Sequence, residues 1–548
     1  MSGVRSPRVA IVDGHLFTPA GIVHDTLLLE AGRIVAVGGA DAEREGATVI
    51  DAAGGLVVPG FQDCHVHPVH AGLEMLACDL GGLSSREEYL ARIRAYAEEH
   101  PAAAWITGGG WSMEAFPGGI AQAGDLDDVA PGRPVYLPSR DGHSAWVSTA
   151  ALRAADITRD TPDPTDGRIE RTPDGEPDGT LQEGAMRLVA DLVEKPSQGD
   201  VEQALLLAQD RLLAWGVTGW QDAMVGASND VPDILPAYLE LARSGRLRAR
   251  VVGALWWDRT RGLEQIEELV EKRARAAEAG FRAEAVKIMQ DGVAENFTAG
   301  MLEPYLDGCG CVTANSGKSF VPPELLAEAS VRLDALGFQL HFHALGDRAV
   351  RESLDAVAAA RAANGEHDHR HTLAHLQVVH PDDVPRFAEL GVVANLQPYW
   401  ACHEPQMDEL TVPFLGAERA RHQYPFGALH RSGARLASGS DWPVSTADPL
   451  AIVHVAVNRA LVEADGGYAE AFLGEQALSL ADAITAHTAG TAYLNHDEEH
   501  SGELVAGKVA DVVVLDRDPF EHPLAEVGLT EVAHTLVGGE VVHSRDAR

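Results

Sequence analysis

The sequence predicts an α/β protein with a distorted TIM (β/α)8 barrel, a small β-sandwich domain formed from both chain termini, and a large insertion after the first barrel strand. From residue 59 to residue 495, apolar β-type segments alternate with helical segments, as a parallel sheet with crossover helices requires. Short β-type runs separated by glycine turns occupy both ends of the chain. About 150 residues separate the first two barrel strands, far more than an ordinary connection needs.

The terminal β-type runs are similar to one another in character and differ from the middle of the chain. They lie at residues 8–13, 27–38, 47–58, 509–516 and 535–543. Because both ends contribute such runs, we expect one composite β-sandwich domain made of residues 1–58 and 496–548.

Eight apolar β-type segments followed by polar or small residues are the expected barrel strands. They are residues 56–67, 216–222, 249–257, 284–291, 338–343, 371–377, 391–397 and 435–441. Helical segments lie between them, for example residues 263–279, where apolar residues recur at helical spacing before Gly280. A TIM barrel carries its active-site residues at the C-terminal ends of its strands, so these ends are where chemistry is expected.

The barrel domain is expected to span residues 59–495, with residues 80–205 as an insertion over the barrel mouth that helps to choose the substrate. Within the insertion, residues 158–180 are rich in Pro, Gly and Asp, which predicts an exposed loop.

Charge and composition exclude several classes of protein. The 43 Lys+Arg against 82 Asp+Glu give a net charge of −39, which repels nucleic-acid phosphates and anionic lipid headgroups. We therefore expect no nucleic-acid partner and no membrane partner. The chain has no signal-peptide pattern, and no segment approaches the roughly 18 apolar residues of a membrane span. These features predict a soluble, cytoplasmic protein, and the odd number of five cysteines argues against a secreted disulfide framework.

His65 and His67 are near the end of the first expected barrel strand, in the string PGFQDCHVHP at residues 59–68. Residues i and i+2 of a strand point to the same face, so the two imidazoles project into one space. Neutral imidazole nitrogens suit Zn, Fe, Ni or Co. Two histidines at this spacing are explained equally well as metal ligands and as ordinary hydrogen-bonded residues. Residues elsewhere in the chain are needed to choose between these two interpretations.

Lys287 lies between Val286 and Ile288, where strand alternation directs its ammonium into the barrel. Burial of an unpaired ammonium costs several kcal/mol or lowers its pKa sharply. A neutral lysine can react with carbon dioxide to form a carbamate, an anionic ligand able to bridge two cations. The alternative is a lysine that reaches the barrel rim or pairs with Asp291.

Three further strand ends carry metal-binding residue types, namely His343, His375 and Asp441. His341 shares a face with His343, so spacing alone does not say which of the two is the ligand. A buried carboxylate such as that of Asp441 needs a positive partner. Taken together, these strand ends predict a site for one or two divalent metal ions, with Zn²⁺ expected.

The sequence resembles the amidohydrolase superfamily, and within it the amidohydrolase 3 branch of YtcJ-like proteins and N-substituted formamide deformylases. The strings that carry the resemblance are GGGW (108–111), DGHSAWVS (141–148), GVTGWQDA (216–223), VKIMQDG (286–292), HALGDRAV (343–350), GSDWPV (439–444) and GKVADVVVLD (507–516), which together cover nearly the whole chain.

This resemblance implies a metal-dependent hydrolase with a definite ligand set. His65 and His67 would hold one metal and His343 and His375 the other, with a carbamylated Lys287 as a possible bridge. Asp441 would be both a ligand and the proton shuttle. The resemblance also favours His343 over His341 and implies a homodimer.

The expected reaction is attack on an amide carbonyl by water that a divalent metal has made acidic. Asp441 would accept the proton and deliver it to the departing nitrogen. His143 is a candidate donor to the developing oxyanion, although a structural loop histidine explains it equally well. Trp111, Trp400 and Trp442 are candidate walls of the substrate site, with ordinary packing as the alternative.

The function expected from these residues is hydrolysis of a linear C–N amide bond in a small-molecule substrate, an N-acyl or N-formyl amine. The rivals are a cyclic-amide hydrolase, a deaminase of heterocyclic amines, and a non-catalytic scaffold that keeps the barrel. A deaminase would usually carry a glutamate shortly after the fifth-strand histidine, whereas His343 is followed by Ala-Leu-Gly-Asp.

Overall fold

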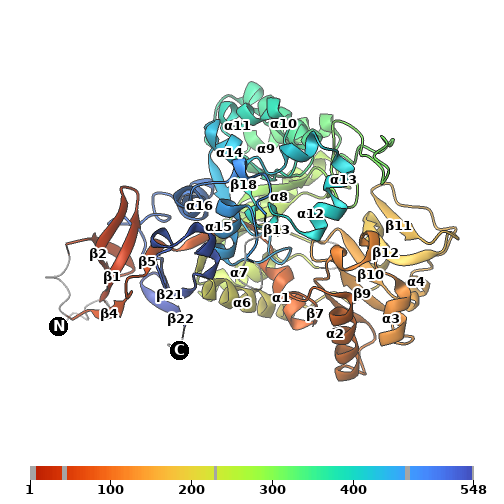
Figure 1. Ribbon diagram of the computed structural model, residues 1–548, viewed down its shortest axis with the longest axis horizontal. Helices are drawn as coiled ribbons and strands as arrows, with labels where there is room; N and C mark the ends of the chain where they lie inside the picture. Colours follow the sequence, from red (N-terminus) through yellow and green to blue (C-terminus); the bar gives the residue numbers. More distant parts are fainter. Residues whose placement is uncertain (1–7, 40–45, 228–230, 463–469, 546–548) are drawn as a thin grey trace.

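The structure is a computed structural model that describes residues 8–39, 46–227, 231–462 and 470–545. Figure 1 shows a sheet of N-terminal strands at one end of the molecule, the barrel in the middle and the insertion at the opposite end. In the described ranges, no helix is both long and apolar enough to cross a membrane.

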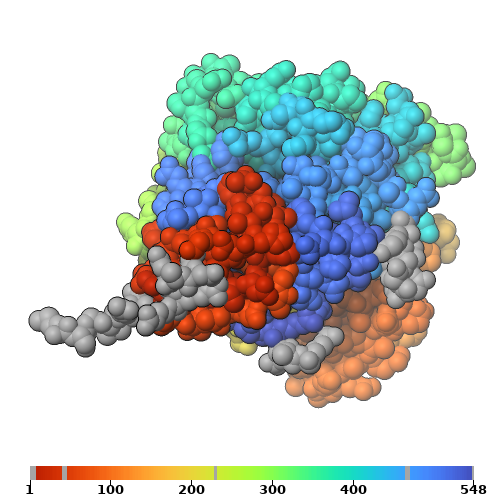
Figure 2. Space-filling model, turned by 60° about the vertical axis from the view of Figure 1, so that its left-hand side comes forward, coloured from red at the N-terminus to blue at the C-terminus, as the bar shows by residue number. Residues whose placement is uncertain are grey.

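Strands from both ends of the chain form one continuous sheet. The strands are β1 (Arg8–Thr18), β2 (Gly21–Glu30), β3 (Arg33–Val37), β4 (Thr48–Asp51), β5 (Leu56–Pro59), β20 (Val512–Leu515), β21 (Val532–Val537) and β22 (Glu540–Ser544). Their order is β22-β21-β20-β5-β1-β2-β3, with β4 beside β1. The antiparallel pair of β5 and β20 joins the two termini, and Figure 2 shows N-terminal and C-terminal segments in contact on the surface.

The barrel is a sheet of eight parallel strands in the order β19-β18-β17-β16-β15-β14-β13-β6. They are β6 (Phe61–Val66), β13 (Val217–Val225), β14 (Arg250–Trp256), β15 (Arg282–Met289), β16 (Gln339–Ala344), β17 (Thr372–His375), β18 (Val393–Leu396) and β19 (Leu436–Ser438). The sheet closes just beyond β19, where Asp441 N donates to His65 O at 2.7 Å and His67 N donates to Trp442 O at 2.9 Å. The predicted barrel is confirmed, because each expected segment overlaps one barrel strand.

The first expected barrel segment, residues 56–67, contains two strands rather than one. Strand β5 belongs to the terminal sheet and β6 to the barrel, and the chain passes between them at Gly60. A Cβ at residue 60 would lie 2.0 Å from Thr218 Oγ1, so only glycine fits this crossing. An unbroken apolar run does not reveal such a change of sheet.

Helices pack around the barrel and cover its outer face (Figure 1). They are α1 (Pro68–Leu76), α6 (Gln198–Ala214), α7 (Leu235–Arg243), α8 (Ile266–Glu278), α9 (Pro323–Ala335), α10 (Asp347–Asn364), α11 (Val384–Leu390), α14 (Phe426–Arg431), α15 (Pro449–Asn458), α16 (Leu480–Thr485) and α17 (Thr491–Leu494). Helix α8 buries Ile266, Leu269 and Ala276 while its charged residues face outward. This amphipathic pattern is what predicts a helix from residue 263 onward.

The insertion has its own sheet of six strands, in the order β11-β12-β10-β9-β8-β7. Its strands are β7 (Cys78–Asp79), β8 (Ile106–Gly109), β9 (Val135–Pro138), β10 (Ser144–Val147), β11 (Gly167–Arg171) and β12 (Pro177–Glu183), and its helices are α2 (Arg86–Glu99), α3 (Ala123–Val129), α4 (Thr149–Ala154) and α5 (Arg187–Ala190).

The prediction of an exposed loop at residues 158–180 is wrong for its second half, because β11 and β12 form a hairpin there. Ile169 and Leu181 are opposite each other in this hairpin, and both are buried. The burial of these two side chains in the insertion core stabilises the strands despite the tendency of the surrounding Pro, Gly and Asp residues to form turns.

Candidate metal centre

The C-terminal ends of the barrel strands bring the predicted metal ligands into one buried cluster. His65 is in β6 and His67 directly follows it, Lys287 is in β15, His343 is in β16, His375 ends β17, and Asp441 follows β19. All except the half-buried His67 are buried. Because the strands are parallel and adjacent, residues nearly four hundred positions apart in the sequence meet at one rim.

His65, His67 and Asp441 offer one ligand atom each, all within 4.8 Å of one another. Asp441 Oδ1 lies 2.9 Å from His67 Nε2 and 3.2 Å from His65 Nε2. Burial raises the pKa of Asp441, but the hydrogen bond and charge of His67 outweigh it and leave the pKa below its usual value. Two imidazoles and one carboxylate suit a divalent cation.

The Lys287 Nζ is buried and lies 3.1 Å from His65 Nε2. Burial lowers the pKa of this amine to about 7, although the nearby Asp441 carboxylate acts in the opposite direction. A sizeable share of the amine is therefore neutral near pH 7, and the neutral amine is the form that can react with carbon dioxide.

His343 and His375 lie on the next two strands, with ring centroids 4.5 Å apart. Burial lowers the pKa of both rings well below the usual value, so both are neutral and can ligate a metal. Neither ring nitrogen of His375 has a hydrogen-bond partner within the described ranges. Buried polar atoms are rarely left unpaired, so this orphaned ring fits a position beside a metal ion.

The structure separates His341 from His343. His341 Nε2 lies 2.9 Å from His65 Nδ1, and its Nδ1 lies 2.5 Å from Gln221 Oε1. Both nitrogens of His341 are therefore occupied below the cluster, and this residue orients His65. The Nδ1 of His343 lies 3.1 Å from Asp291 Oδ1, which leaves its Nε2 available.

Two buried aspartates that hold the ligands were not predicted as site residues. Asp63 accepts hydrogen bonds from His65 N at 3.0 Å and Ser440 N at 3.1 Å, and burial raises its pKa to about 7. Asp291 accepts from the backbone of Gly300 and Gly346, and burial likewise raises its pKa to about 7. Such partners orient metal ligands, but a lone aspartate after an apolar run gives little sequence signal.

The ligands occupy unusual backbone conformations as well. His375 has φ 80° and Asp441 has φ 57°, although neither is glycine. Strained residues of this kind concentrate at functional sites, where surrounding contacts hold them in place. The two side chains approach each other across the rim, with His375 Nδ1 at 4.0 Å from Asp441 Oδ2.

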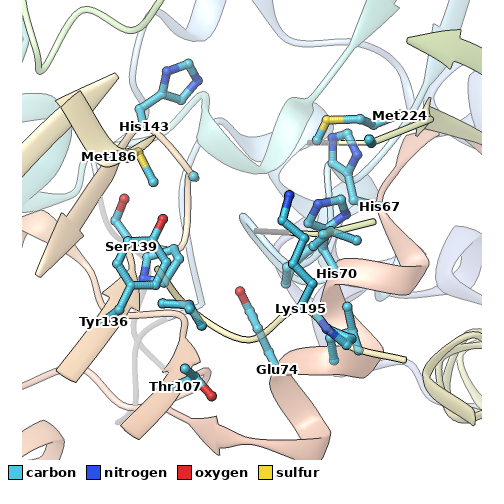
Figure 3. A pocket seen from close by; sticks show the side chains of 18 of the residues that line it. His67, His70, Glu74, Thr107, Tyr136, Ser139, His143, Met186, Lys195 and Met224 are labelled. Atoms are coloured by element: carbon cyan, nitrogen blue, oxygen red, sulfur yellow. The ribbon is translucent and has the colours of Figure 1, made fainter. Parts of the chain in front are cut away.

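A cavity of about 910 Å³ opens from this cluster and extends between the barrel and the insertion. Figure 3 shows His67 and His70 on one side and His143, Tyr136 and Ser139 of the insertion on the other. The His143 ring lies 5.5 Å from the His343 ring, so the insertion contributes directly to the site. Glu183 also lines this cavity, although no motif or spacing in the sequence singles it out.

His143 and Glu183 form a buried ion pair, with His143 Nδ1 at 2.9 Å from Glu183 Oε1. Burial lowers the pKa of His143, but Glu183 more than compensates and raises it to about 9. Burial raises the pKa of Glu183, and His143 lowers it to about 2. His143 is therefore a charged hydrogen-bond donor at neutral pH.

Residues 48–543 match the sequence model of the amidohydrolase family. The chain belongs to this family. The amidohydrolase is 30% identical over 494 residues to the putative amidohydrolase YtcJ of Bacillus subtilis (strain 168), and the aligned region covers 90% of each chain. It is 26% identical over 539 residues to the N-substituted formamide deformylase of Arthrobacter pascens, and the aligned region covers 95% of each chain.

A solved structure shares the whole architecture of this amidohydrolase. It is an uncharacterized metal-dependent hydrolase from Pyrococcus furiosus, with 26% identity, a TM-score of 0.68, and coverage of 93% of this chain and 99% of the other. The family and this structural likeness support hydrolase activity that depends on metal.

The structure corrects the prediction that three tryptophans form walls of the substrate site. None of them is among the described residues that line the cavity. Trp111 is fully buried in the insertion core, where its indole N–H donates to Leu137 O at 2.8 Å. Trp400 stacks on the His375 ring at 5.4 Å and 14°, and Trp442 packs edge-on against Trp215 at 5.7 Å. Proximity in sequence to a site residue does not give the direction of a large side chain.

We expect Trp111→Ala to destabilise the insertion by about 3–5 kcal/mol because it leaves a cavity in a closed core. At a temperature where the variant is folded, its KM should change little, since Trp111 does not face the cavity. Thermal melting and steady-state kinetics measure the two effects. A large rise in KM without a change in melting would restore Trp111 as a substrate wall.

Proposed function

We propose that this amidohydrolase cleaves a linear C–N amide bond of an N-acyl or N-formyl amine. The observation that carries the proposal is the position of the neutralisable Lys287 amine, 3.1 Å from His65 Nε2, beside an Asp441 carboxylate that contacts two histidines. A lysine bridge has no role in a mononuclear deaminase. The name of the Arthrobacter pascens relative, which acts as an N-substituted formamide deformylase, points to the same bond.

In this proposal the site holds one or two divalent ions, with zinc preferred. His65, His67 and Asp441 would hold the first ion, His343 and His375 would hold the second, and a carbamylated Lys287 would supply an anionic oxygen ligand to them. The orphaned nitrogens of His375 and the neutral state of the buried imidazoles are the features that fit such ions. A divalent ion here supplies a Lewis acid that makes water acidic and polarises the amide carbonyl.

The side chains then move one proton. Asp441 accepts a proton from the attacking water as a C–O bond forms at the carbonyl carbon. His143 donates a hydrogen bond from Nε2 to the carbonyl oxygen as that oxygen gains negative charge. Asp441 returns the proton to the nitrogen as the C–N bond breaks, so a carboxylic acid and an amine leave.

We expect the metal-replete enzyme to release amine from a panel of N-formyl, N-acetyl and longer N-acyl amines. Chelation should abolish this turnover and added Zn²⁺ should restore it, because the Lewis acid is needed to activate water. Cyclic imides and heterocyclic amines form the contrast set. Ring opening alone, or ammonia release alone, would redirect the assignment to the corresponding hydrolase, and a protein with neither stoichiometric metal nor turnover would be a scaffold.

A further inference from the structure

His143 and Glu183 both come from the insertion, on neighbouring antiparallel strands. His143 immediately precedes β10 and Glu183 ends β12, where Ser144 pairs with Gln182. Glu183 N donates to His143 O at 2.9 Å, and the two side chains meet at 2.9 Å. The insertion sheet therefore presents this pair as a preformed unit.

Loops of the barrel hold the pair from the other side. Thr298 Oγ1 donates to Glu183 Oε1 at 2.9 Å, and Arg259 Nη1 lies 3.8 Å from Glu183 Oε2. Asn296 Nδ2 donates to the His143 carbonyl at 3.2 Å. Contacts from both the insertion and the barrel therefore hold the pair, and Glu183 has an unusual conformation with φ 51° and ψ −127°.

The free end of the His143 ring faces the reacting region. Its Nδ1 is engaged by Glu183, whereas Nε2 has no hydrogen-bond partner among the described side chains and the residue lines the cavity. In Figure 3, His143 and His67 are on opposite sides of this cavity. A purely structural ion pair would have no need to present one nitrogen to the space beside His343.

We propose that Glu183 is a positioning residue that holds His143 Nδ1–H, so that His143 Nε2–H is aimed at the substrate carbonyl oxygen, and that the insertion thereby completes the catalytic centre. This inference rests on the proposed amide hydrolysis. A carboxylate beside the far nitrogen of an imidazole favours the doubly protonated ring, in which both nitrogens carry a hydrogen, and fixes the direction in which the other N–H points. The barrel contributes the metal ligands, and the insertion contributes the oxyanion donor.

The first test is Glu183→Gln in the metal-loaded enzyme, with an N-acyl amine that the wild type cleaves. We expect kcat to fall by about 100-fold to 1000-fold, the effect of removing one oxyanion donor, with KM and metal content nearly unchanged. Glu170→Gln is the matched control, because Glu170 is on β11 of the same insertion, contacts Arg168 and does not line the cavity. A kcat for Glu183→Gln equal to that of the control would overturn the proposal.

The second test separates positioning from a general structural role. His143→Gly opens space for free imidazole, which should restore part of the lost turnover if Glu183 can hold it. Imidazole should restore much less in the double variant His143→Gly/Glu183→Gln. Equal rescue in both backgrounds would refute the positioning role even if both proteins are folded and metal-loaded.

Two precautions keep the outcome decisive. If Glu183→Gln melts below the assay temperature, Glu183→Asp is measured instead, with an intermediate loss of kcat expected because its carboxylate is one methylene shorter. If the wild type cleaves no N-acyl amine, the proposed function fails. The same variants are then measured on whichever cyclic imide or heterocyclic amine the wild type turns over, so the two failures are distinguishable.

Discussion

Asp441→Asn is expected to lower kcat by about 1000-fold to 10,000-fold, near the upper end of what one proton-transfer group contributes. Asp441 is buried and its Oδ1 lies 2.9 Å from His67 Nε2, while its pKa stays below the usual value because His67 outweighs burial. The carboxylate is therefore ionised and ready to accept a proton. An asparagine keeps a ligating oxygen of nearly the same shape but has no comparable basicity.

Metal content and kcat should be measured on the same preparation of Asp441→Asn. We expect the metal to remain bound while amine release is nearly lost. Asp448→Asn is a suitable control, because Asp448 caps α15 through Leu450 N and does not line the cavity, and asparagine also caps helices. Wild-type turnover in metal-loaded Asp441→Asn would show that another group carries the proton.

Lys287→Ala is expected to lower kcat/KM by about 100-fold or more, because a metal clamp contributes several kcal/mol to transition-state stabilisation. The Nζ lies 3.1 Å from His65 Nε2, and its burial disfavours the charged form although the nearby Asp441 carboxylate favours it. Alanine removes the only atom at this position that could carry a carbamate, so the second ion should also be bound more weakly. The fold should persist, since the substitution removes a buried amine rather than a packed apolar group.

Intact mass and metal stoichiometry test the role of Lys287 directly. The wild type should carry the added mass of one carbon dioxide, lose activity in carbonate-free buffer and recover it with bicarbonate. Lys272→Ala, a change in an α8 lysine that pairs with Asp233 and Glu268, should behave like the wild type. Near-normal turnover of Lys287→Ala after metal reloading would reject the bridge.

The barrel and the metal-ligating residue types could be predicted because each rests on a local regularity. Apolar segments alternate with helical segments along the chain, and parallel strands must all end at the same rim. His65 and His67 share a face by the two-residue period of a strand. Lys287 stands out because an ammonium between buried valine and isoleucine is costly.

Other features depend on contacts between distant segments and left no local signal. The hairpin of β11 and β12 is hidden by turn residues, and its stability comes from burial of Ile169 and Leu181 in the insertion core. The chain passes from one sheet to the other at Gly60, where a side chain would collide with Thr218, a residue far along the chain. The direction of Trp111 is likewise decided by the core into which it packs.

By itself, the amino-acid sequence determined the barrel, the use of both termini in one β-region, and the residue types at the strand ends. The spacing of apolar residues and the free-energy cost of burying a charge can both be read from short stretches of sequence. The resemblance already favoured His343 over His341, but only the tertiary structure showed the contacts that separate the two residues and joined Glu183 to His143. Those assignments depend on which atoms approach within hydrogen-bonding distance. Such approaches are set by the packing of the insertion on the barrel, which no single segment encodes.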